Sequence, residues 1–164
     1  MRRLCLTLLC GLVAVPAALA ATYATGDGVL EVSNGAGVIV LNTTRGIVWG
    51  QVAKGKLVVT DPSPSDGSVF VSGAVGTITP GSETVTTYRG RDLHFRVTGG
   101  KIKLTLKGFG IDLTAVGVGT AQLAGDAYAA DVGLYALDNS PKWNPLPVFS
   151  TKTVSFGVQS APAP

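Results

Sequence analysis

A cluster of basic side chains is the feature of this sequence that most directly suggests chemistry. Six Lys and Arg residues fall between positions 89 and 107, and the one acidic residue among them is Asp92. Cations this close together attract an anionic polymer, such as teichoic acid or an acidic polysaccharide, or the headgroups of acidic phospholipids. The alternative is that they keep a strand soluble and protect a sheet edge from aggregation. The binding candidates are the four that should share one outer face: Arg96, Lys101, Lys103 and Lys107.

Two tryptophans could offer flat surfaces to sugar rings. Trp143 lies in residues 138–147, a proline-rich segment that is expected to be a surface loop, so it is a further binding candidate. The alternative for Trp143 is that it caps an open end of the core. Trp49 lies in a strand-like segment and aligns with Leu113 in the internal repeat described below, so we expect Trp49 in the core.

The sequence indicates no catalytic residue. His94 is the only histidine, no Gly-x-Ser-x-Gly motif is present, and His94 should lie on an outer strand face. A glycosidase needs two carboxylates across a cleft, but Glu31 is on the outward phase of its strand. Most aspartates border Gly or Pro in turns, while Asp112 interrupts an apolar strand and is expected to point outward.

No metal or cofactor is expected either. Both cysteines, Cys5 and Cys10, precede residue 21, and one histidine cannot form a zinc or copper centre. Calcium could bind in the segment Asp61–Gly67, but its spacing does not match that of an EF-hand loop. Phosphate-cradling and dinucleotide-binding motifs are missing.

Two segments, residues 93–97 and 102–106, show the strict alternation of a strand with one buried face. A two-residue loop, Gly99-Gly100, suits a tight hairpin turn because glycine adopts positive φ angles. We therefore expect a hairpin in which Arg96 faces Lys103. This register would place the four basic candidates on one outer face.

The class predicted for the whole chain is all-β. Helix-forming runs are missing after residue 21, and short β-branched segments alternate with turn residues such as Asn34-Gly35. We expect a single β-sandwich, in preference to a closed barrel, with about 9–10 short strands. Asp61–Gly67 and residues 138–147 should be loops, while residues 126–137 fit a helical turn or a strand.

The chain also contains an internal similarity. Leu30–Gly35 resembles Phe95–Gly100 with an offset of 65 residues, and Gly46-Ile47 resembles Gly110-Ile111 with an offset of 64. A duplication would predict two similar meanders of roughly four or five strands each. A chain rich in Gly and Val also produces such matches by chance.

Residues 1–20 have the features of a secretory signal, with Arg2 and Arg3, an apolar run over Leu4–Val15 and the small residues of Ala18–Ala20. The run is shorter than the roughly 20 residues that span a bilayer. We expect a signal peptide over residues 1–20, an all-β domain over residues 21–160 and a disordered tail over residues 161–164. Cleavage leaves 11 Lys and Arg against 10 Asp and Glu, so the net charge of the mature chain does not suggest nucleic acid as a partner.

Several segments resemble a group of small secreted bacterial β proteins of unknown function. They are Gly46–Val52, Leu57–Pro62, Tyr88–Val97 and Gly110–Gly117. The resemblance implies an all-β fold and a bacterial, exported protein, and it implies no activity and no site residues.

Together these observations predict an exported, non-catalytic protein that binds envelope or extracellular material, with an anionic cell-wall polymer or polysaccharide as its partner. One alternative is a secreted hydrolase whose carboxylates converge only in the fold. Another is a barrel that holds a small apolar ligand.

The mature protein should begin at Ala21, because signal peptidase cleaves after a small-x-small pattern. N-terminal sequencing of exported material measures this directly. A lipid-bearing start at Cys10 would contradict the prediction.

Overall fold

The computed structural model describes residues 26–82 and 84–157, so the expected signal peptide, its cleavage site and the tail lie outside the described residues. The regular structure is one antiparallel sheet of seven strands, which confirms the all-β prediction. Within the described residues there is no helix that is long and apolar enough to span a bilayer. The strands are β1 (Gly28–Thr60), β2 (Ser68–Ser82), β3 (Val85–Gly99), β4 (Ile102–Gly125), β5 (Leu134–Leu137), β6 (Asn144–Pro145) and β7 (Lys152–Phe156).

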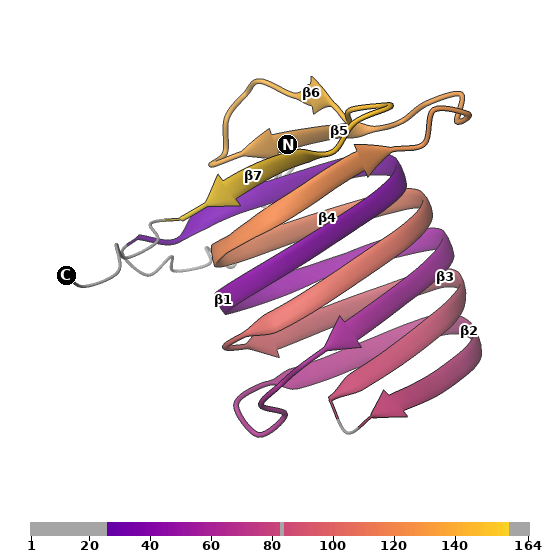
Figure 1. Cartoon of the computed structure of the whole chain (residues 1–164), viewed down its shortest axis with the longest axis vertical. Coiled ribbons are helices and arrows are strands. Elements are labelled where there is room, and N and C mark those ends of the chain that lie inside the picture. The colour runs from indigo at the N-terminus through magenta and orange to yellow at the C-terminus, as the bar shows by residue number, and fades with distance from the viewer. Residues whose placement is uncertain (1–25, 83, 158–164) are drawn as a thin grey trace, which may run out of the picture.

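The sheet winds around its own axis as a flattened coil, with β2 at one end and β5, β6 and β7 at the other (Figure 1). β1 and β4 pair with each other along both of their edges. Thr105, for example, pairs with both Val40 and Val58, so one turn of the coil takes 18 residues of β1. The sheet is open and is not closed into a barrel.

Glycines allow the long strands to turn the two narrow corners of the coil. They recur every ninth residue, at 28, 37, 46 and 55 in β1 and at 90, 99, 108 and 117 in β3 and β4. The register aligns them across the strands, because Gly46 pairs with both Gly99 and Gly117, and Gly55 pairs with both Gly90 and Gly108. A Cβ atom on Gly46, whose φ is +138°, would lie 2.2 Å from the carbonyl oxygen of Val116. Only glycine fits a corner where two backbones approach this closely.

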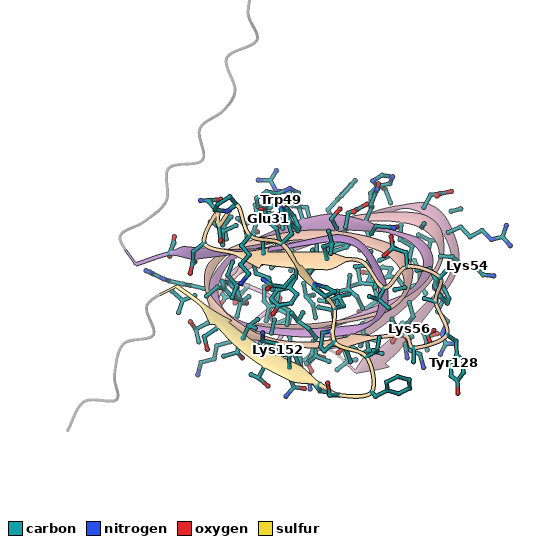
Figure 2. The ribbon with its side chains drawn as sticks, turned by 90° about the horizontal axis from the view of Figure 1, so that it is seen from above. Glu31, Trp49, Lys54, Lys56, Tyr128 and Lys152 are labelled. Atoms are coloured by element: carbon teal, nitrogen blue, oxygen red, sulfur yellow. The ribbon has the colours of Figure 1, made fainter. Side chains whose placement is uncertain are left out.

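Between the corners the coil has two faces that pack against each other as in a β-sandwich, and buried side chains fill the space between them (Figure 2). Leu30, Val52 and Leu113 come from one face, and Ile39, Leu57 and Leu104 from the other. The filled interior does not favour an apolar ligand held inside a barrel. We call the face with Leu30, Val52 and Leu113 the groove face; it contains residues 29–33, 47–52, 68–72, 91–98 and 111–116. We call the other the opposite face; it contains residues 38–43, 56–60, 85–89, 102–107 and 119–124.

The expected hairpin between residues 93–97 and 102–106 is wrong, although the alternation of buried and exposed residues is confirmed. Leu93 and Leu104 are fully buried, yet β1 lies between β3 and β4 in the sheet. The Gly99-Gly100 segment turns a corner of the coil, so that the two segments lie on different faces. Asn34-Gly35 likewise forms a bulge within β1, where Asn34 has a φ of +50°.

The strand count and the predicted pair of meanders also differ from the structure. Segments that were expected to be separate strands merge, and β1 alone spans 33 residues, because its glycines let hydrogen bonding continue around the corners. The two halves of the proposed duplication do not form separate meanders, since β1 interleaves with β4. The segments Asp61–Gly67 and 126–133 are loops, and residues 134–137 form a strand.

We expect Gly46→Ala to destabilise the fold by roughly 2–4 kcal/mol, since it combines a positive φ with a backbone collision. Gly76→Ala is the control, because the nearest heavy atom to its added Cβ is the Arg89 carbonyl oxygen at 3.7 Å. That change should stay within about 1 kcal/mol. Denaturant unfolding of both variants measures the difference, and equal stabilities would show that the corner accommodates a side chain.

Candidate binding groove

The groove face carries an open hollow of about 1000 Å³ that crosses β1, β2, β3 and β4. Its lining combines exposed aromatic rings with hydrogen-bonding side chains. The aromatic residues are Trp49, Phe70 and Trp143, and the polar residues include Glu31, Gln51, His94, Arg96 and Asp112.

One row of side chains follows the length of the hollow across the strands. In order, Phe70 pairs with Arg96, Arg96 with Trp49, Trp49 with Thr114, and Thr114 with Glu31. Neighbouring strands lie about 4.8 Å apart, so the backbones of Phe70 and Trp49 are about 10 Å apart. Trp49 and Glu31 of this row lie on the same side of the coil in Figure 2.

Trp143 extends the groove beyond β1. It directly precedes β6, which pairs with β5, and β5 in turn pairs with the segment Leu30–Ser33 of β1. Trp143 is 41% exposed and contributes to the lining of the hollow, so its ring is available at the surface, as its candidate role requires.

The aromatic rings point outward because of the phase of their strands. Val48 and Val52 are buried, so Trp49 between them faces solvent and is 38% exposed. The expectation that Trp49 belongs to the core is therefore wrong. On β2, Val71 packs against the core, so the preceding residue, Phe70, points outward and is 61% exposed.

The second row of the groove contains Asp112, Gln51 and His94, which are neighbours across β4, β1 and β3. Asp112 accepts hydrogen bonds from the backbone N–H of Asn34 at 2.8 Å and from Nε2 of Gln51 at 2.7 Å. It thereby ties the bulge at Asn34 to the groove floor. Asp112 and His94 both lie on the outward side of the sheet, as expected.

The four basic candidates do not form one patch. Arg96 lies in the groove, whereas Lys103 lies on the opposite face. Lys101 lies at the corner that links β3 to β4, and Lys107 lies beside Gly108 at the other corner. The predicted register placed them together only because it assumed a hairpin.

Metal ligation has no candidate cluster within the residues that the structure describes, where no three His, Cys, Asp or Glu side chains group together. In the segment Asp61–Gly67, which was considered for calcium, the carboxylates accept hydrogen bonds from the segment itself and from the corner at Gly100. Oδ1 of Asp61 accepts a hydrogen bond from the N–H of Ser63 at 2.9 Å, and Oδ1 of Asp66 accepts one from the N–H of Gly100 at 3.4 Å.

Sequence reasoning missed Phe70 and Gln51 as site residues. Their signal is positional, since each lies on the outward phase of its strand: Gln51 directly precedes the buried Val52, and Phe70 directly precedes Val71, which packs against the core. The outward direction of each side chain follows from the alternation of its strand alone.

Comparison with known proteins found no match to a family model, a curated protein or a solved structure. The resemblance to small secreted bacterial β proteins therefore stays a prediction.

Replacing Asp112 by Ala should destabilise the protein by about 1–2 kcal/mol, because it removes the acceptor for two hydrogen bonds. Glu31→Ala in the same groove is the comparison, with an expected change within about 0.5 kcal/mol. Urea unfolding followed by circular dichroism measures both, and an Asp112 variant as stable as the Glu31 variant would contradict a structural role for this carboxylate.

Proposed function

We propose that this protein is an exported, non-catalytic module that binds a polysaccharide of the envelope or extracellular space along the groove. The row of Phe70, Arg96 and Trp49 is the observation that carries the proposal. It combines flat apolar surfaces with a hydrogen-bond donor, the two kinds of contact that a sugar ring needs.

The spacing of the aromatic rings supports an extended ligand. One strand, β3, lies between Phe70 on β2 and Trp49 on β1, and the resulting distance of about 10 Å is comparable to that spanned by two linked pyranose rings. Trp143 adds a third ring at the far end of the groove. A polymer that crosses the strands could therefore stack on successive rings while its hydroxyl groups contact the polar side chains between them.

The charges in the groove favour a neutral polysaccharide over a polyanion. Arg96 is offset by two carboxylates, Glu31 and Asp112, along the same lining. A strongly anionic chain would meet repulsion from both carboxylates. The anionic partner predicted from the sequence is thus better matched to a different surface.

Hydrolysis is a second candidate because the fold brings Glu31 and Asp112 onto neighbouring strands of one groove. Two carboxylates flanking a sugar chain are the minimum for glycoside cleavage. Asp112 already accepts two hydrogen bonds within the protein, which favours a structural role for it. Release of reducing ends that is lost in Glu31→Gln would support hydrolysis over binding alone.

Affinity electrophoresis through gels that contain hydroxyethyl cellulose, xylan or glycol chitin tests the binding proposal. The protein should be retarded by at least one of these polymers. The double variant Trp49→Ala, Phe70→Ala should lose affinity by about tenfold or more, because it removes two central aromatic contacts.

The matched control is Tyr128→Ala, Phe149→Ala. These aromatic residues are 97% and 91% exposed and do not line the groove, so the control should migrate like the unmodified protein. No retardation in any gel, or equal retardation of the two double variants, would overturn the proposal.

A further inference from the structure

A second group of cations gathers at the corner of the coil that contains Gly55 and Gly108. Lys56 on β1 pairs directly with Lys107 of β4 on one side and with Arg89 of β3 on the other. Lys54 pairs with Phe109 of β4 and with Arg91 of β3. Lys54 and Lys56 project at one narrow end of the coil in Figure 2. We call Lys54, Lys56, Arg89 and Lys107 the cationic corner.

The fold does not favour this arrangement. Like charges placed directly opposite each other on neighbouring strands destabilise the pair, and here three cations lie in one continuous row. Solubility requires only that charges be spread over the surface. Solubility alone therefore does not explain why these cations are neighbours on adjacent strands.

The cationic corner surrounds a hollow of about 390 Å³ whose floor is formed by Gly55 and Gly108. Because these two residues have no side chains, the space between the cations stays open. Phe109, which is 50% exposed, forms part of the rim. The residues that line this hollow, all of them in the described part of the chain, include four cations and no carboxylate.

We propose that the cationic corner is a binding site for phosphate groups. A phosphate carries up to two charges and three acceptor oxygens, so it can contact several of these cations at once. A single carboxylate has fewer oxygens and one charge, and it would leave part of the cluster unneutralised. The phosphate could belong to a soluble polymer or to a lipid headgroup, since the chemistry that the corner recognises is the same.

This site is separate from the groove, because the two linings have no residue in common. The proposal therefore goes beyond polysaccharide binding and does not depend on it. It also changes which residues account for the anion binding expected from the sequence. Lys107 remains a candidate, joined by Arg89, Lys54 and Lys56, while Lys101 and Lys103 lie elsewhere.

The test compares two double variants that lose the same charge, Lys56→Gln, Lys107→Gln at the corner and Lys101→Gln, Lys103→Gln outside it. The corner variant should fold, since it relieves repulsion between opposed cations. Binding of sodium tripolyphosphate is measured by isothermal titration calorimetry. Sedimentation with vesicles of phosphatidylcholine, with and without phosphatidylglycerol, forms the second arm.

The unmodified protein should bind tripolyphosphate or the anionic vesicles, and the arm that responds identifies the source of the phosphate. The affinity of the corner variant should fall by about tenfold or more, while the control variant keeps its affinity. Absence of binding in both arms, or equal losses in the two variants, would overturn the proposal. Equal affinity for polygalacturonate would overturn the assignment to phosphate.

Discussion

Backbone-to-backbone contact at the two corners of the coil is the constraint on which the rest of the structure depends. A Cβ atom would lie 2.2 Å from a carbonyl oxygen of the adjacent strand at Gly46, and likewise at Gly108. Because glycine occupies these positions, a strand can turn the corner without leaving the sheet. Hydrogen bonding therefore continues from one face to the other, and both faces contribute to one core. A conventional sandwich instead ends each strand at its edge and joins the faces by loops.

The same constraint organises the surface into two chemically different regions. Between the corners the strands are regular, so outward side chains line up in rows, and the row of Phe70, Arg96 and Trp49 follows from this register. At the corner near Gly55 the pairing of Lys56 with Lys107 and Arg89 brings together cations from three strands. The aromatic surface and the cationic surface are both consequences of the winding.

The sequence allows the direction of most strand residues to be predicted, but not the partners of the strands. Alternation depends on neighbouring residues alone, and for Leu93 and Leu104 it correctly indicates burial. Pairing depends on segments far apart in the chain, and Gly99-Gly100 is compatible with a hairpin turn or with a corner. The spacing of glycines by nine residues was the signal that separates these options, because a hairpin needs no such period.

The candidate sites show the same division between local and long-range information. Trp143 was a binding candidate from its loop alone, with a cap on the core as the alternative, and the structure places it in the groove lining with 41% exposure. Grouping the four basic candidates required a correct register: the assumed hairpin placed them on one face, whereas the pairing of β1 between β3 and β4 separates them.

The two surfaces differ in the balance of their charges. The groove balances Arg96 against Glu31 and Asp112, whereas the lining of the cationic corner holds four cations without a carboxylate. Interactions between exposed charges are largely screened beyond about 8 Å at physiological ionic strength, and among the described residues the linings of the two surfaces have no residue in common. A polymer with both sugar rings and phosphate groups could engage the two surfaces together, and its effective affinity would then exceed that of either contact alone. The winding of one sheet thus places aromatic rings among charges of both signs on one face, and gathers four cations, with no carboxylate among the described residues that line the hollow, at one corner.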